Sequence, residues 1–213
     1  EKRRMEITNY YTEAGEGFTL ILLHGNVENH EYFVHQIACF SKNHRVLALD
    51  TRGHGKTPRG DGPFTIAQFA EDLRVFLDNL NIQQADILGF SDGGNIAMVF
   101  AMKYPGRVRN LILNGANLDA KGVKPVVQIP IVLGYWLAGL FAAKSPQARL
   151  HAEMLGLMVN DPNVKPKELK KITARTLVIA GTKDMIKRSH TELIARSIAG
   201  AELVFLEGDH FIA

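Results

Sequence analysis

The feature that most constrains the fold is the run G-F-S-D-G-G at positions 89–94. The residues just before it, 85–88, form a short apolar run, which is typical of a buried strand. The residues just after it, 95–104, carry apolar side chains at helical spacing and stop at Pro105. The sequence therefore predicts a strand, a tight turn and a helix in direct succession, with Ser91 at the tip of the turn.

The residue types around Ser91 fit a serine that is chemically active. Gly89 and Gly93 have no Cβ atom, so neighbouring backbone can pass close to a strained turn. The start of the helix supplies free N–H groups and a positive dipole end, which stabilise negative charge on the oxygen of an attacked carbonyl group. Ser91 is therefore predicted to be a nucleophile. The alternative is a glycine-rich turn that only packs closely.

Strand and helix patterns alternate along most of the chain. Short apolar runs read as strands, and amphipathic runs between them read as helices, one of which begins with a capping Thr65. The strand runs cover 19–23, 45–49, 85–88, 108–113, 176–180 and 202–206. This alternation predicts an α/β fold with a mostly parallel sheet and helices on both faces. Residues 10–17 add a predicted opening hairpin.

The alternation lapses once, after the strand that follows the Ser91 helix. This predicts a first core part over 1–115, an inserted short helical lid over 116–167 and a second core part over 168–213. Within the insert, 126–143 is almost wholly apolar, but it contains Pro130 and two glycines and is barely long enough for a bilayer. We expect a buried or pocket-covering helix there, not a membrane span.

A serine hydroxyl needs a base near neutral pH, and the base needs an orienting carboxylate. In parallel sheets, functional groups gather just past the carboxyl ends of the strands. Asp184 and His210 each follow a predicted strand in a short loop, so they are the predicted acid and base. The rival carboxylates are Asp50, for which Arg52 and the turn offer a structural role, Asp119, and Asp209 beside the histidine.

Two backbone N–H groups form the predicted oxyanion hole. One belongs to Asp92, directly after the nucleophile, and the other to Asn26, in the loop after the run 19–23. The side chains of His24, Asp92 and Trp136 are the candidate pocket residues. Two interpretations of the Asp92 carboxylate stay open: it is favoured at a helix start by the dipole, or it points into the pocket and pairs with a cationic group of the substrate.

Five motifs in this order resemble the α/β-hydrolase superfamily over nearly the whole chain: L-H-G-N (23–26), D-T-R-G-H-G (50–55), G-F-S-D-G-G (89–94), G-T-K-D (181–184) and G-D-H (208–210). The Ser-Asp-Gly-Gly turn, with N-G-A-N at 114–117, is similar to the valacyclovir-hydrolase-like branch. The resemblance implies the α/β-hydrolase fold, with Ser91 as nucleophile, Asp184 as triad acid and His210 as base. It also implies a C-terminal helix after the histidine, and we expect this helix to be missing from the chain.

The favoured function is a serine hydrolase that cleaves a small carboxylic ester, or a thioester or lactone, through an acyl-enzyme on Ser91. A serine at the turn argues against the dehalogenases and epoxide hydrolases of the superfamily, which use aspartate there. Two alternatives remain. One is a carbon–carbon bond hydrolase with the same triad, and the other is a non-catalytic small-molecule receptor of the same fold.

Composition limits the partners, cofactors and cellular location that the chain is expected to have. A chain of 213 residues fits one domain. A net charge of +3, with no basic stretch interleaved with aromatic residues, argues against a nucleic-acid partner. Cys39 is the only cysteine, which excludes an intramolecular disulfide, and its apolar helical context predicts burial. No metal-ligand spacing occurs, so no metal or cofactor is expected. The absence of a signal-peptide pattern predicts the cytoplasm, and a homodimer is compatible with the sequence.

Overall fold

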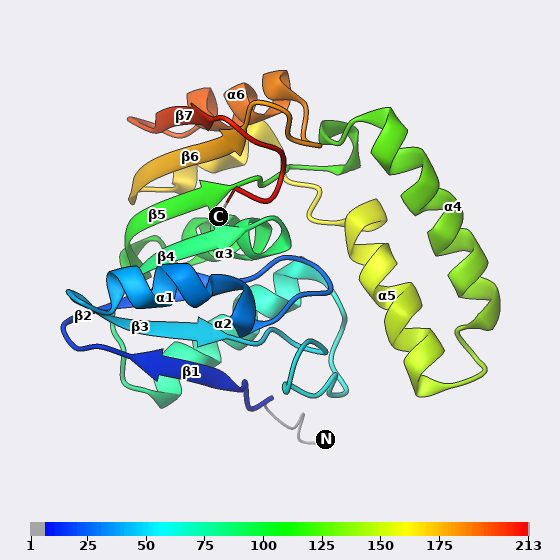
Figure 1. The fold of residues 1–213 in the computed structure, drawn as a ribbon, viewed down its shortest axis with the longest axis horizontal. Helices are drawn as coiled ribbons and strands as arrows, with labels where there is room; N and C mark the ends of the chain where they lie inside the picture. Colours follow the sequence, from blue (N-terminus) through cyan, green and yellow to red (C-terminus); the bar gives the residue numbers. More distant parts are fainter. Residues whose placement is uncertain (1–6, 213) are drawn as a thin grey trace.

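The computed structural model describes residues 7–212 and is built around a seven-stranded sheet (Figure 1). The strand order is β1-β3-β2-β4-β5-β6-β7, and every neighbouring pair is parallel except β1 and β3. The strands are β1 (Tyr11–Ala14), β2 (Phe18–Leu23), β3 (His44–Leu49), β4 (Ala85–Phe90), β5 (Val108–Asn114), β6 (Arg175–Gly181) and β7 (Glu202–Leu206). The predicted α/β fold with a mostly parallel sheet is confirmed.

Helices occupy the connections between the strands. They are α1 (Val34–Phe40), α2 (Ile66–Asn79), α3 (Asp92–Lys103), α4 (Pro125–Phe141), α5 (Pro146–Asn160) and α6 (Arg188–Ser197), with 3-10 helices η1 (His30–Phe33), η2 (Pro105–Arg107), η3 (Ala120–Gly122) and η4 (Pro166–Lys171). Helix α2 begins where its capping residue predicts, because the Thr65 hydroxyl accepts a hydrogen bond from the N–H of Gln68 at 3.1 Å. Its predicted apolar stripe, including Ile66, Phe69 and Leu73, is buried.

The predicted opening hairpin is wrong. Strand β1 does not pair with β2; it lies antiparallel to β3, with Tyr11 opposite Leu49. Strand β2 pairs with β3 and β4 in parallel, and Leu20 through Leu23 are buried. An apolar strand buries the most apolar surface at the centre of the sheet, where both of its faces are covered. The more polar β1 is left at the edge, where one of its sides has no strand partner among the described residues.

Helices lie on both faces of the sheet, as predicted, but unequally (Figure 1). Helices α2, α3 and α6 cover one face and share the larger core with it, which includes Phe69, Phe100 and Ile194. On the other face α1 lies over a smaller cluster that Ile37 and Phe40 join. Cys39 projects away from this contact and is exposed, so its predicted burial is wrong.

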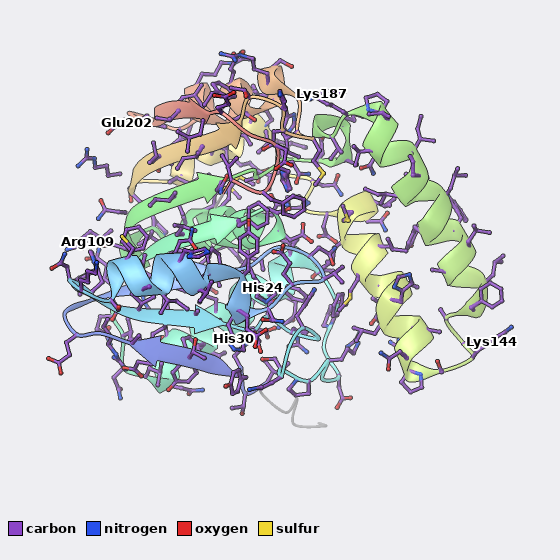
Figure 2. The ribbon with its side chains drawn as sticks, in the orientation of Figure 1. His24, His30, Arg109, Lys144, Lys187 and Glu202 are labelled. Atoms are coloured by element: carbon purple, nitrogen blue, oxygen red, sulfur yellow. The ribbon has the colours of Figure 1, made fainter. Side chains whose placement is uncertain are left out.

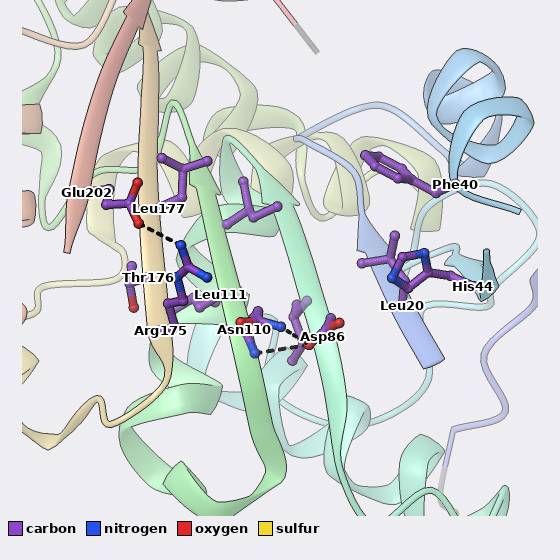
Figure 3. Close-up of a pocket in the computed structure, with 12 residues that line it drawn as sticks. Leu20, Phe40, His44, Asp86, Asn110, Leu111, Arg175, Thr176, Leu177 and Glu202 are labelled. Atoms are coloured by element: carbon purple, nitrogen blue, oxygen red, sulfur yellow. Dashed lines mark hydrogen bonds and ion pairs between the residues drawn. The ribbon is translucent and has the colours of Figure 1, made fainter. Parts of the chain in front are cut away.

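A groove of about 330 Å³ crosses the α1 face of the sheet (Figure 3). Its polar lining includes Asp86, Asn110, Arg175 and Glu202, which lie at or near the amino ends of β4, β5, β6 and β7. Asn110 donates to the Asp86 carboxylate at 2.8 Å, and Arg175 pairs with Glu202 at 3.0 Å. Since ligands of parallel sheets bind beyond the carboxyl ends of the strands, this groove lies at the wrong edge for an active site.

Helices α4 and α5 form a hairpin, residues 125–160, that stands beyond the carboxyl ends of the strands (Figure 1). Of the two expectations for 126–143, the buried helix is wrong, because no residue of α4 is buried. The helix does cover a cavity, which Trp136 and Leu140 line. Its inner side packs on α5, and its outer side faces solvent. Within residues 7–212, no helix combines the length and apolar character that crossing a bilayer requires.

Candidate active site

The strand-to-helix turn at Ser91 has the strained shape that its glycines predict. Ser91 has φ +53° and ψ −119°, a conformation that side-chain-bearing residues rarely adopt. Its N–H donates to the carbonyl of Asn114 at 2.8 Å, which ties the turn to β5. A Cβ atom on Gly93 would collide with the carbonyl of Leu23, and one on Gly89 would collide with the carbonyl of Gly93. The turn therefore requires glycine at both positions.

Three side chains from distant loops meet at this turn. His210 Nε2 lies 3.0 Å from Ser91 Oγ, and His210 Nδ1 lies 2.7 Å from Asp184 Oδ1. Asp184 Oδ1 also accepts the N–H of Ile186 at 2.8 Å, which fixes the carboxylate. Both the acid and the histidine are buried, at 2% and 4% exposure. The spacing is that of a nucleophile, a base and an orienting acid.

Each rival carboxylate has another partner. Asp50 is fully buried and accepts from His30 Nδ1 and from the backbone N–H of Lys56, both at 2.8 Å. Arg52, its expected partner, pairs instead with Asp72. Asp119 caps η3 through the N–H of Lys121. Asp209 accepts the N–H of Phe211, so it turns away from its histidine neighbour.

The predicted oxyanion donors come from two segments that are far apart in the sequence. Asp92 is the first residue of α3, where a backbone N–H has no acceptor within the helix. Asn26 follows β2, and its side-chain amide donates to the carbonyl of Met154 on α5 at 2.7 Å. This hydrogen bond joins the loop after β2 to the α4–α5 hairpin, and no sequence pattern predicted it.

Glu28 is a site residue that the sequence reasoning missed. Its Oε2 accepts the N–H of Gly25 at 3.0 Å and thereby holds the loop that carries Asn26. Burial raises the pKa of Glu28 above its usual range, although the Gly25 N–H and the charge of His210 oppose this rise. No sequence motif includes Glu28, and a glutamate in a polar loop is too common to indicate a site residue.

The Asp92 carboxylate is buried beside the nucleophile with little to stabilise its charge. Oδ1 accepts a long hydrogen bond from Asn95, 3.3 Å, and Oδ2 accepts no hydrogen bond of normal geometry from the described residues. The side chain of Asn26 also stabilises the charge, but weakly. Burial first, and then repulsion by Asp161, raise the pKa of Asp92 to about 6. Burial also raises the pKa of Asp161, which stands at the end of α5. The carboxylate of Asp161 therefore lies close enough to Asp92 to repel its charge, and the charge of His210 offsets this only in part.

This arrangement has a cost in stability that depends on pH. The folded-state pKa of about 6 exceeds the ordinary value of 3.8, so the folded protein binds the proton more tightly than the unfolded chain does. Stability therefore falls as pH rises through this interval and stays low above it. Asp92→Asn should raise the free energy of unfolding by about 1–3 kcal/mol at about pH 8 and by almost nothing at about pH 4.

Urea denaturation of both proteins at the two pH values measures this difference. The exposed carboxylate Asp61 provides a matched control, since Asp61→Asn removes a charge of the same sign without removing a buried one. If Asp92→Asn changed the free energy of unfolding equally at both pH values, the buried charge of Asp92 would not be the cause of the lower stability.

The predicted pocket role of His24 is wrong. This side chain is 1% exposed, and both ring nitrogens are occupied: Nδ1 contacts the carbonyl of Gly25 at 2.7 Å and Nε2 accepts the N–H of Thr51 at 3.0 Å. Burial and the adjacent His54 lower the pKa of His24 to about 4, so the ring is neutral. His24 therefore fastens the loop after β2 to the loop after β3 (Figure 2).

Trp136 lines a cavity, but not one that Ser91 lines. The cavity has a volume of about 650 Å³ and lies between α4, α5 and the segment before α2. Its apolar wall includes Phe64, Tyr135 and Leu140, and its polar end includes Asp161, the carboxylate that repels Asp92.

Within residues 7–212, no group of His, Cys, Asp and Glu side chains is arranged to hold a metal ion.

Comparison with known proteins identifies relatives of the chain. It is 38% identical over 107 residues to 2-hydroxymuconate semialdehyde hydrolase of Pseudomonas putida, a match that covers 49% of this chain and 38% of that protein. It is 28% identical over 206 residues to 3-oxoadipate enol-lactonase 2 of Acinetobacter baylyi, covering 82% and 75% of the two chains. The chain thus matches less than two-fifths of the length of the Pseudomonas relative.

A solved structure and a family model agree with the fold. The enol-lactonase from Burkholderia xenovorans superimposes with a TM-score of 0.80 at 24% identity, over 96% of this chain and 90% of that chain. The model of the alpha/beta hydrolase fold matches residues 19–153, which run from within β2 to within α5 and include the Ser91 turn. The chain belongs to the alpha/beta hydrolase fold family.

Proposed function

We propose that this chain is a serine hydrolase that cleaves small carboxylic esters, including lactones and thioesters, through an acyl-enzyme on Ser91. The observation that carries the proposal is the hydrogen-bonded series from Asp184 through His210 to Ser91, at 2.7 Å and 3.0 Å. The ring of His210 contacts the rings of Phe90 and Phe211, whose centroids lie 4.9 Å and 5.5 Å away in a tilted and an edge-on arrangement. A histidine so confined keeps one nitrogen on the acid and the other on the hydroxyl.

In the proposed reaction, Ser91 Oγ attacks the carbonyl carbon while His210 Nε2 takes the hydroxyl proton. The carbonyl oxygen becomes negative and is stabilised by the backbone N–H groups of Asp92 and Asn26. The bond to the leaving alkoxide then breaks, and His210 returns the proton to it. Water attacks the acyl-enzyme by the same steps, which frees the acid and restores Ser91.

Sustained turnover of p-nitrophenyl acetate, together with fluorophosphonate labelling that maps to Ser91, would support the proposal. A single stoichiometric burst without turnover would instead favour the receptor alternative, because the acyl group would form and then remain. Labelling of a serine other than Ser91 would overturn the assignment. Peptide mapping by mass spectrometry and a steady-state assay distinguish these results.

A carbon–carbon bond hydrolase is the second candidate. The 38% identity to 2-hydroxymuconate semialdehyde hydrolase favours it, and the same serine, histidine and acid would serve. The two functions are separated by substrate: a β-diketone would be cleaved to a ketone and an acid, whereas an ester releases an alcohol. A kcat/KM for the diketone above that for its matched ester would replace the ester proposal.

The carboxylate pair beside Ser91 supports a narrower substrate class, esters that carry an amine. A buried carboxylate with an unpartnered Oδ2 and a second acid nearby would be stabilised by a substrate cation. We expect Asp92→Asn to lower kcat/KM for an amino-acid ester at least about tenfold more than for the ester that lacks the amine, since a hydrogen bond between charged groups contributes about 1.5–3 kcal/mol.

Kinetics on these two matched esters give this comparison directly. The preference for the amine should also increase as pH rises through about 6, where Asp92 ionises. The backbone N–H of residue 92 is retained in the variant, so the oxyanion contact serves as an internal control. An equal loss on both esters would exclude the amine site and leave the hydrolase proposal intact.

A further inference from the structure

Helix α4 exposes an apolar face that nothing in the described chain covers. Seven large apolar side chains along it are between 48% and 77% exposed: Val126, Ile129, Leu133, Trp136, Leu137, Leu140 and Phe141. They recur three or four positions apart, so they lie along one side of a helix about 25 Å long. We call this surface the α4 stripe. A continuous apolar surface of this kind indicates an interaction site, not an ordinary solvent-facing helix.

The charged residues in the segment that carries the α4 stripe all have one sign. Residues 120–152 contain no Asp or Glu, but they contain Lys121, Lys124, Lys144 and Arg149. Lys124 caps the start of α4, and Lys144 follows its end, where Nζ lies 4.3 Å from the centre of the Phe141 ring. Figure 2 places Lys144 at the far tip of the hairpin. None of the three lysines forms an ion pair with the described residues, whereas Arg149 pairs with Glu153.

This charge pattern discriminates between possible partners. A second copy packed stripe against stripe would bring lysines near lysines, with no carboxylate on either stripe to compensate, and like charges across an interface are unfavourable. A lipid surface with anionic headgroups fits both features. It accepts apolar side chains below the headgroups and attracts the lysines at the two ends of the helix.

We propose that the α4 stripe docks the protein on the surface of a bilayer that contains anionic lipids. The hairpin lies beyond the carboxyl ends of the strands, on the side of the sheet where Ser91, Asp184 and His210 meet (Figure 1). Docking would therefore bring the cavity between α4 and α5 close to the lipid. The docking itself does not depend on the proposed hydrolase activity.

The chain contains a built-in probe for the experiment. Trp136 is the only tryptophan, and it lies in the α4 stripe at 70% exposure. Mixing the full chain with vesicles of phosphatidylcholine and phosphatidylserine should shift its emission to shorter wavelength and carry the protein into the vesicle pellet. Each lysine near an anionic surface strengthens binding about fivefold, so the partition coefficient should fall about 100-fold on pure phosphatidylcholine. Added salt should weaken the binding in the same direction.

Two pairs of variants separate the apolar and the electrostatic contributions. Leu133→Ser with Leu140→Ser should abolish both the emission shift and sedimentation, while Leu203→Ser with Leu206→Ser, on exposed positions of β7, should change neither. Lys124→Gln with Lys144→Gln should lower the partition coefficient on anionic vesicles about 25-fold. Lys170→Gln with Lys171→Gln, on η4, is the matched lysine control and should leave it unchanged. Thermal melts establish that each variant is folded.

Three results would overturn the proposal. The first is an unchanged Trp136 emission and no sedimentation with anionic vesicles. The second is binding that survives the Leu133→Ser, Leu140→Ser change. The third is a lipid-free dimer, detected by analytical ultracentrifugation, that this same change dissociates while vesicles bind neither protein. That result would assign the α4 stripe to a second copy of the chain.

Discussion

Ser91→Ala is expected to lower kcat/KM for p-nitrophenyl acetate by about 10⁴- to 10⁶-fold, because it removes the atom that forms the acyl-enzyme. The loss corresponds to about 5–8 kcal/mol of transition-state stabilisation. His210 and Asp184 would remain in place but would have no hydroxyl to activate. A residual rate above that in water would come from the backbone donors and from substrate positioning alone.

The matched control for this change is Ser189→Ala, which removes an exposed hydroxyl from α6. It should retain the wild-type rate and the wild-type fluorophosphonate labelling, whereas Ser91→Ala should lose both. A thermal melt accompanies each assay, because the left-handed backbone at residue 91 makes the turn sensitive to substitution. Activity that survives Ser91→Ala within tenfold would remove the basis of the proposed mechanism.

Asp184→Asn is expected to reduce kcat by about 10³- to 10⁴-fold while the fold is retained. Asp184 accepts a hydrogen bond from the protonated Nδ1 of His210. This leaves Nε2 without a proton, so it can accept the proton of Ser91. An asparagine can offer an N–H to Nδ1, which would favour the tautomer that carries its proton on Nε2. That tautomer can donate to Ser91 but cannot deprotonate it.

Asp119→Asn is the control carboxylate, because the rival acid caps η3 and contacts neither His210 nor Ser91. It should keep kcat within about twofold, since changes at a turn cap act mainly on stability. Stopped-flow measurement of the acylation burst would show whether Asp184→Asn slows the attack itself. If Asp119→Asn caused the larger loss of the two, the assigned acid would be wrong.

Several features of the site were predictable because they depend on neighbours in the sequence. The turn at Ser91 needs glycine within two residues on either side, and those glycines are visible in the sequence. The start of α2 depends on Thr65 and the N–H three residues later. Asp184 and His210 each follow a strand, and parallel strands bring their carboxyl ends to one edge. The alternation of strands and helices thereby predicted which residues meet.

Other features depend on contacts between distant parts of the chain. No local pattern predicts that β3 separates β1 from β2, since the choice rests on which strand gains more from burial on both faces. The role of His24 is decided by the N–H of Thr51 in another loop. The exposure of α4 depends on what α5 and the sheet leave uncovered, and hydropathy alone did not decide between a buried and a pocket-covering helix.

The sequence by itself determined the order of the elements, the strained serine turn and the identity of the three residues proposed to act there. These follow from periodicity, capping and glycine positions, which operate over a few residues. Only the tertiary structure decided that Ser91 and His210, 119 residues apart, lie within hydrogen-bond distance. It also decided that Asp161 lies close enough to Asp92 to raise its pKa. Burial and long-range electrostatics depend on everything that packs around a group, so no short stretch of sequence contains them.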